Sequence, residues 1–298
     1  KDYLTAVHHS MDYPFQSEDG RDASPMHQQL ETTCKRFNPI KYWQFTNCCT
    51  DSLQIAFHIL CKPGDTVIVP AYGWRAITNA PQFVGLHVIY CDIDDTGNID
   101  LNQLQHLIIE HKPTAVLIVH NFGTIVDISK IADICLVNNV SIIEDAAPSF
   151  VMNESYKYKL GSYSDIVCFS FDFTKSPGCL GAGGGLATNS EELFNKIKTV
   201  GSHITSTHGI GTKSYLDTIA AGVLNTDIKL IEQNNYRQHR VNIATYYINN
   251  LPYKTLSGEN YIFHRFIILT DRDKKQAVIE KFKSQKILAK SVFDPNIS

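Results

Sequence analysis

The chain has 298 residues, of which 43% are hydrophobic and 19% are charged, and its formal net charge is −3. This length can bury a large core, arranged as one large α/β domain or as a large domain with a small one. The slightly acidic charge argues against a nucleic-acid-binding protein, and no apolar run approaches the roughly 20 residues that span a bilayer.

Strand and helix patterns alternate between about residues 45 and 190. Short apolar runs predict strands at 67–69, 86–91, 115–119, 140–143, 166–169 and 185–188. Apolar residues at helical spacing predict helices at 53–60, 101–109 and 128–137, the last with Asp127 as N-cap, and Ser190 is expected to cap a further helix. This alternation predicts a mostly parallel sheet with helices on both faces.

The pattern changes after residue 215. Residues 216–251 are helix-rich and predict a long helix that links two domains, followed by a strand at 261–269 and a helix at 274–283. We therefore predict an N-terminal segment and large domain at 1–225, and a linker helix with a small α+β domain at 226–298. The start at Lys1 and the end at Ser298, which lacks an evident closing element, are consistent with a chain that is incomplete at either end.

The eight cysteines include no C-x-x-C pair, and most lie in apolar segments. This usage predicts reduced, buried thiols in a cytoplasmic protein. No second cluster of Cys and His completes a tetrahedral site with Cys48 and Cys49, so no metal site is predicted.

Polar side chains at the ends of two predicted strands carry the most informative pattern. Asp145 follows one apolar run, while Ser170 and Lys175 follow another. Many proteins hold pyridoxal 5'-phosphate with three such residues: a lysine that forms a Schiff base, an aspartate that contacts the pyridine nitrogen and a serine that binds the phosphate. A surface lysine and an ordinary strand-end aspartate are the alternative, but the ordered combination favours the cofactor.

Six segments in order resemble motifs of the DegT/DnrJ/EryC1/StrS family of pyridoxal-phosphate-dependent sugar aminotransferases. Residues 46–53 resemble S-N-G-T-D-A-L, 64–70 resemble G-D-E-V-I-V-P, 119–123 resemble V-H-L-Y-G, 144–147 read E-D-A-A, 169–175 resemble S-F-x-P-T-K before the glycine run 183–185, and 211–218 resemble G-T-N-S-R-L-D-T. The resemblance covers roughly residues 40–295, and it implies a fold type I pyridoxal-phosphate enzyme.

The resemblance also implies roles for two of these residues in the chemistry. Lys175 would form the Schiff base with the cofactor and then move the proton at the substrate α-carbon. Asp145 would keep the pyridine nitrogen protonated, which makes the ring an electron sink. The retained Lys175 argues against the dehydratase branch of the family, in which histidine replaces that lysine.

Five further residues are implied to bind the cofactor. Thr50 and Asp51 would present backbone N–H groups to the phosphate at a helix start, and Ser170 would add a hydroxyl. Trp74 would stack on the ring, and Lys213 would reach the phosphate of a partner subunit. The structural alternatives are a plain N-cap for Thr50, a buried strand serine for Ser170, a core tryptophan for Trp74 and a solvated surface lysine for Lys213.

The chain departs from the family at five positions. Pro148 stands where Gln or His reaches the cofactor hydroxyl, and Ala182 stands where the family has Asp or Glu. Lys213 replaces the phosphate-binding Asn, Tyr215 replaces the neighbouring Arg, and Cys49 replaces Gly. These changes bear on specificity and efficiency.

The resemblance implies a homodimer with shared active sites that transfers an amino group from L-glutamate to a nucleotide-linked keto sugar. A 4-keto-6-deoxy hexose is the first expectation for the acceptor. Two alternatives stay open, namely an aminotransferase that acts on another cyclic ketone, and a degenerate family member that acts as a binding or regulatory subunit. No nucleic acid or membrane partner is expected.

Overall fold

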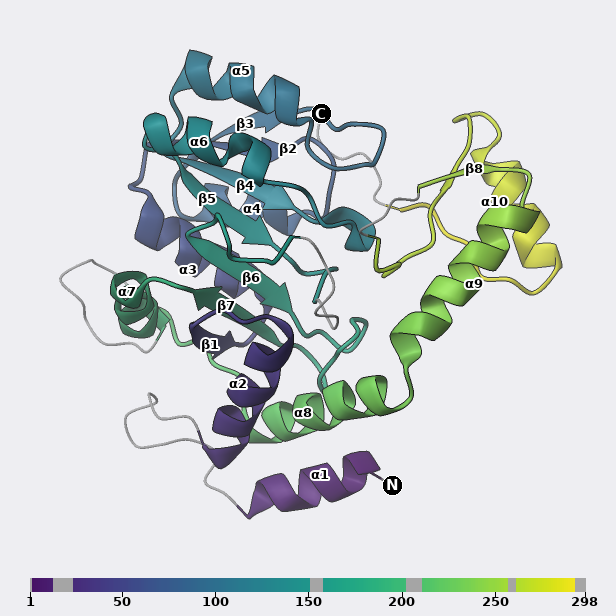
Figure 1. Ribbon diagram of the computed structural model, residues 1–298, viewed down its shortest axis with the longest axis horizontal. Helices are drawn as coiled ribbons and strands as arrows, with labels where there is room; N and C mark the ends of the chain where they lie inside the picture. Colours follow the sequence, from purple (N-terminus) through teal and green to yellow (C-terminus); the bar gives the residue numbers. More distant parts are fainter. Residues whose placement is uncertain (1, 13–23, 151–157, 202–210, 257–260, 293–298) are drawn as a thin grey trace.

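The computed structural model describes residues 2–12, 24–150, 158–201, 211–256 and 261–292. Its centre is a seven-stranded sheet (Figure 1). The strands in spatial order are β1 (Tyr42–Thr46), β7 (Gly184–Thr188), β6 (Ile166–Ser170), β5 (Ser141–Asp145), β4 (Ala115–Val119), β2 (Thr66–Pro70) and β3 (His87–Cys91). The five strands from β6 to β3 are parallel, whereas β7 is antiparallel to both of its neighbours.

The prediction of a mostly parallel sheet is confirmed. Each predicted strand from residue 67 to 188 is present, with ends shifted by at most two residues. All five residues of β4, β6 and β7 are buried, which explains their continuous apolar runs, because strands covered on both faces do not alternate.

Helices cover both faces of the sheet (Figure 1). Packed on one face are α3 (Cys49–Leu60), α4 (Ala76–Phe83) and α7 (Glu191–Gly201). The other face carries α5 (Leu101–His111) and α6 (Ser129–Val137), and nearer to β1 it carries α2 (Pro25–Phe37) and α8 (Thr218–Gln233). Against α8 packs the first helix, α1 (Asp2–Met11).

Two helix predictions need correction. The N-cap of α6 is Ile128 and not Asp127. The Asp127 carboxylate nevertheless accepts a hydrogen bond from the N–H of Ser129, the first residue of α6, at 3.2 Å. The long helix predicted over 216–251 is two helices, α8 and α9 (Tyr236–Asn250). Asn235 separates them with φ at 50°, a left-handed conformation that asparagine tolerates and that ends the regular helix.

The strand predicted over 261–269 is wrong for most of its length. Only Ile268–Leu269 form a strand, β9, which pairs with β8 (Lys254–Thr255), and Tyr261 makes an isolated bridge to Thr124. The helix predicted at 274–283 is α10 (Lys275–Ser284). Figure 1 shows α9, α10 and β8 to one side of the sheet.

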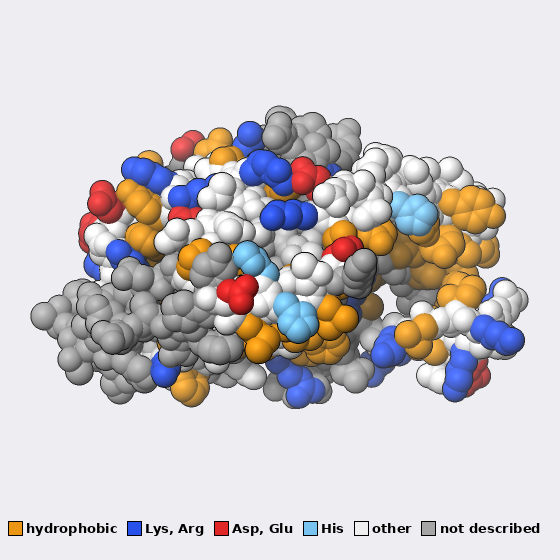
Figure 2. All heavy atoms as spheres, turned by 90° about the horizontal axis from the view of Figure 1, so that it is seen from below, with side chains coloured by type: hydrophobic (Ala, Val, Ile, Leu, Met, Phe, Trp, Pro, Cys, Tyr) orange, Lys and Arg blue, Asp and Glu red, His pale blue; other side chains and the backbone are white. Residues whose placement is uncertain are grey.

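The division into domains stays a proposal, since the boundary at residues 225 and 226 falls within α8. The expectation about the chain end concerns residues outside the described ranges. Within those ranges, no helix is both long and apolar enough to cross a membrane. Acidic and basic side chains are interspersed on the face shown in Figure 2.

Candidate active site

The carboxyl ends of β4, β5 and β6 bring polar residues to one edge of the sheet. Asp145 is the last residue of β5, Ser170 is the last residue of β6, and His120 directly follows β4. The His120 N–H donates to the Asp145 carbonyl at 3.1 Å, so the ends of β4 and β5 are joined. Ligands bind at this edge of open α/β sheets.

Lys175 lies on the connection 171–183 that joins the antiparallel strands β6 and β7. The chain reverses there, so both ends of the connection meet at the same sheet edge. The Lys175 backbone N–H donates to the Asp172 carbonyl at 2.7 Å, and the Asp172 carboxylate accepts the Thr174 N–H at 2.9 Å. The Gly178 N–H donates to the Asp227 carboxylate on α8 at 2.9 Å, which anchors the connection from the other side.

The surroundings of Lys175 favour its neutral amine. Burial lowers the pKa of Lys175, and the nearby positive charge of Arg265 lowers it further, whereas Asp145 raises it. A lysine must lose its proton before it can act as a nucleophile. The lowered pKa therefore fits the role expected for Lys175.

Asp145 is a buried carboxylate. Burial raises its pKa, and this effect is opposed by the Ala147 N–H, which donates to it at 2.9 Å, and by the nearby Lys175. The Cys49 Sγ lies 3.9 Å from the same carboxylate oxygen. Cys49, which stands at a family glycine, therefore contacts the candidate site directly.

His120 and Glu144 form a buried hydrogen-bonded pair beneath the strand ends. The His120 Nε2 lies 2.8 Å from the Glu144 Oε2, and the two side chains are 0% and 2% exposed. The His120 Nδ1 accepts the Val126 N–H at 3.1 Å, which leaves the Nε2 proton to be donated to Glu144. Because successive strand residues point to opposite faces, Glu144 and Asp145 serve different sides of the sheet.

The start of α3 fits an anion. The N-cap, Cys48, makes no side-chain capping hydrogen bond. The first turn of a helix carries backbone N–H groups that suit an anion. The carboxylate of Asp51 accepts from the Ser214 hydroxyl at 2.6 Å. Asp51 could therefore contribute its backbone N–H, whereas its side chain is already bound to Ser214.

The other expected cofactor residues differ in their positions. Thr50 is half-buried in the first turn of α3, and Ser170 is buried at the end of β6, next to Gly184 of β7. Trp74 follows β2 with 65% of its surface exposed. Lys213 is exposed, and its Nζ lies 5.4 Å from the centre of the Tyr215 ring. The structure thus brings together Lys175 and Asp145 at the sheet edge, while the roles of the other residues stay predictions.

The sequence analysis missed two titratable residues near Lys175. His264 and Arg265 belong to the segment predicted as a strand, and they match none of the quoted motifs. Burial and, to a smaller extent, the positive charges of Lys175, Arg265 and Arg240 together lower the pKa of His264 to about 3. A histidine and an arginine inside an apolar run were the only available signal.

The lowered pKa of His264 predicts an acid-sensitive fold. In the unfolded chain His264 binds a proton below about pH 6.5, whereas in the folded protein it stays neutral down to about pH 3. The free energy of unfolding is therefore unaffected by this group above pH 6.5 and decreases as the pH falls toward 3. This one group should contribute a loss of up to about 1.4 kcal/mol per pH unit in that window. Urea unfolding of the wild type and His264→Gln between pH 7 and pH 5 measures it, and equal slopes in both proteins would contradict the prediction.

Potential metal ligands do not gather elsewhere. Across the described ranges, no group of three or more His, Cys, Asp and Glu side chains is suited to a metal ion.

Comparisons with known proteins relate the chain to aminotransferases. The model of the DegT/DnrJ/EryC1/StrS aminotransferase family matches residues 14–298. UDP-2-acetamido-2-deoxy-3-oxo-D-glucuronate aminotransferase of Pseudomonas aeruginosa is 33% identical over 69% of this chain and 58% of that protein. 3-Oxo-glucose-6-phosphate:glutamate aminotransferase of Bacillus subtilis is 27% identical over 93% of this chain and 65% of that protein. The chain thus spans less than two thirds of either relative.

A solved structure extends the comparison to the fold. The structure of NtdA from Bacillus subtilis with bound cofactor PMP superposes with a TM-score of 0.81 at 25% identity, over 95% of this chain and 66% of that chain. The fold type I assignment from the sequence is confirmed. The chain belongs to the DegT/DnrJ/EryC1/StrS aminotransferase family, whose members depend on pyridoxal phosphate.

Proposed function

We propose that this protein is a pyridoxal-phosphate-dependent aminotransferase that transfers an amino group from L-glutamate to a nucleotide-linked keto sugar. One observation carries the proposal: the buried Asp145 lies near Lys175 at the carboxyl edge of the sheet, and burial lowers the pKa of Lys175. Family membership and the names of the relatives support it.

The residues at this edge fit pyridoxal phosphate. The uncapped start of α3 and the Ser170 hydroxyl suit its phosphate, and the buried Asp145 suits its pyridine nitrogen. A protonated pyridine nitrogen would provide the counter-charge that the buried carboxylate needs. When bound, the cofactor supplies an electron sink for the carbon from which the amino group moves.

The chain's own groups perform the remaining tasks. Lys175 would hold the cofactor through its neutral amine and, once the amino donor has displaced that amine, would move the proton at the substrate α-carbon. Asp145 holds the proton on the pyridine nitrogen. The His120–Glu144 pair fixes the edge from which Asp145 projects, since His120 is hydrogen-bonded to the Asp145 backbone.

Two kinds of keto sugar are proposed as the acceptor. A 4-keto-6-deoxy hexose on a nucleotide is our first choice. A 3-keto sugar is the second choice, because both relatives described above carry 3-oxo sugars in their names. The name of the Bacillus subtilis relative also includes glutamate as the donor.

We also propose a homodimer in the cytoplasm, with residues of both subunits at each site. Large apolar side chains near the sheet edge are exposed, namely Trp74 (65%), Phe173 (70%) and Leu180 (66%). A second copy of the chain would bury them. The eight cysteines are free, which suits a reducing compartment.

Lys213 is expected to bind the cofactor phosphate of the partner subunit. An ammonium facing a phosphate contributes about 1.5–3 kcal/mol, so Lys213→Ala should raise the cofactor dissociation constant about ten- to hundredfold. Binding should also become less sensitive to salt, as fluorescence titrations at several ionic strengths would measure. An unchanged affinity would mean that Lys213 is a solvated surface lysine.

The proposed reaction is tested in two halves. Mixing the holoenzyme with L-glutamate should remove the visible absorbance of the bound cofactor, and a nucleotide-linked keto sugar should restore it. A panel of 3-keto and 4-keto sugars then identifies the acceptor. Cofactor binding without any response to glutamate would instead favour a non-catalytic family member, to which Pro148, Ala182 and Tyr215 would contribute.

A further inference from the structure

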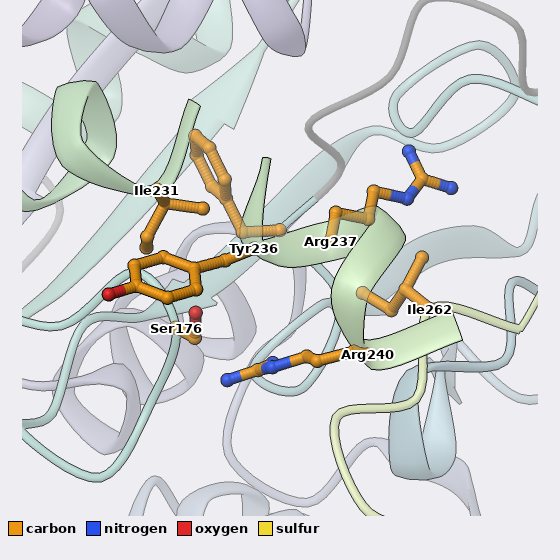
Figure 3. Close-up of a pocket in the computed structure, with 7 residues that line it drawn as sticks. Ser176, Ile231, Tyr236, Arg237, Arg240 and Ile262 are labelled. Carbon is orange, nitrogen blue, oxygen red and sulfur yellow. The ribbon is translucent and has the colours of Figure 1, made fainter. Parts of the chain in front are cut away.

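A pocket lies beside α9 and is lined in part by Ser176 (Figure 3). Its apolar wall is formed by Phe150, Ile231 and Ile262, and its polar wall includes Ser176, Tyr236 and Arg240. Ser176 directly follows Lys175 in the chain. A molecule that fills the pocket would therefore contact the residue that follows this lysine, and Arg240 and Lys175 both lie near enough to His264 to lower its pKa.

Arg240 is the cation that extends across this pocket. Figure 3 shows its side chain directed from α9 toward Ser176, whereas the guanidinium of Arg237 is directed away. Burial lowers the pKa of Arg240, while the charge of Asp227 raises it. Arg240 is half-buried, and a partly dehydrated guanidinium is stabilised when an anion compensates for the lost hydration.

The nearest acidic residue does not provide that anion. Both oxygens of Asp227 are already hydrogen-bonded, one to the Tyr3 hydroxyl and the other to the Gly178 N–H. Within the described parts of the chain, no carboxylate lies within 4.0 Å of Arg240. Its guanidinium donors are thus available to a molecule in the pocket.

Further positive charge surrounds the same place. Arg240 and Arg265 both lower the pKa of His264, and Arg265 lowers that of Lys175. At Lys175 the effect of Asp145 exceeds that of Arg265, whereas the field at His264, two residues from Ile262 of the pocket wall, is positive. Such a field favours a negatively charged substrate.

We propose that Arg240, assisted by the Ser176 hydroxyl, binds an anionic group of the substrate whose reacting carbon lies at Lys175. The inference rests on the proposed aminotransfer. A guanidinium fork pairs with the two oxygens of a carboxylate or of a phosphate. In this reaction the anion is a carboxylate of the dicarboxylic amino donor or a phosphate of the nucleotide-linked acceptor.

Direct binding measurements on the holoenzyme test the pocket. Glutarate represents the donor carboxylates, and UDP, dTDP and GDP represent the acceptor phosphates. Calorimetric titrations compare the wild type with Arg240→Gln and with Arg240→Lys, which keeps the charge but loses the fork. Arg272→Gln, a change at an exposed arginine outside the pocket, is the matched control.

We expect Arg240→Gln to weaken the binding of one class of probe about ten- to hundredfold, Arg240→Lys to weaken it less, and Arg272→Gln to leave it unchanged. Weaker glutarate binding assigns the pocket to the donor, weaker nucleotide binding assigns it to the acceptor, and weakening of both assigns it to an anion that both present. Unchanged affinities in a folded Arg240 variant, or a wild type that binds neither probe, overturn the proposal.

Failure of this inference can be told apart from failure of the proposed function. Borohydride trapping of the cofactor on Lys175 reports on the function alone, and it should be the same in the wild type and in the Arg240 variants. If trapping fails in the wild type, the proposed chemistry is wrong whatever the probes do. If trapping succeeds while the affinities are unchanged, only the role of Arg240 is wrong.

Discussion

Lys175→Ala is expected to abolish amino transfer, with a loss of at least about 10²–10⁴-fold, because the variant lacks both the attachment point of the cofactor and the proton-moving amine. Borohydride reduction followed by peptide mapping should find the cofactor on Lys175 in the wild type and on no residue in the variant. The contacts expected for the phosphate are untouched, so pyridoxal phosphate should still bind without a covalent bond.

Two controls make this result specific. Lys175→Arg keeps the positive charge, but its guanidinium stays protonated and should be as inactive as alanine. Lys274→Ala removes an exposed lysine that pairs with Asp271, and it should be fully active. An adduct mapped to another lysine, or substantial turnover in Lys175→Ala, would contradict the assignment.

Asp145→Asn should separate cofactor binding from chemistry. The amide has the same shape but no charge to keep the pyridine nitrogen protonated, so the electron sink is lost. We expect cofactor affinity to fall modestly and amino transfer to fall by about two or more orders of magnitude, in the range of other proton-transfer defects. Stopped-flow absorbance of the glutamate half-reaction measures the second effect.

Unfolding measurements on the variants should exclude a folding defect. Burial raises the pKa of Asp145, so its charge is unfavourable in the cofactor-free protein, and Asp145→Asn should unfold no more easily than the wild type. Asp165 is a second carboxylate whose pKa is raised by burial, and it lies at the opposite end of β6. Asp165→Asn should leave transfer rates intact, and near-normal turnover in Asp145→Asn would show that another group manages the ring charge.

The strands could be predicted because buried parallel strands leave continuous apolar runs. Ala115–Val119 is predicted to the residue, since every side chain in it is buried. The direction of a strand leaves no such trace. Gly184–Thr188 is buried on both faces like its neighbours, so its antiparallel direction follows from pairing and not from composition.

The C-terminal third was harder to predict because local pattern and tertiary contact disagree there. The polar run through Asn234 and Asn235 has no strong breaker, yet Asn235 adopts a left-handed conformation and redirects the chain into α9. Residues 261–269 are apolar enough for a strand, but most of them pack against other elements instead, as Tyr261 does beside Phe122.

The same contrast holds within the candidate site. Lys175 and Asp145 were identifiable because they follow strands at motif spacing. Arg240, His264 and Arg265 reach the site from α9 and from the segment after β8, and no local pattern encodes that approach. Glu144 and His120 lay within quoted motifs, but their pairing depends on the register of β4 and β5.

The antiparallel pairing of β6 and β7 also has a consequence for assembly of the protein. The hairpin of β6 and β7, which carries Lys175, closes a short loop. The pairing of β1 with β7 instead joins strands that are far apart in the sequence. Closing a long loop is entropically less favourable and is typically slower. The connection that carries Lys175 is therefore closed by a contact that is local in the sequence, whereas completion of the sheet at β1 depends on a distant one.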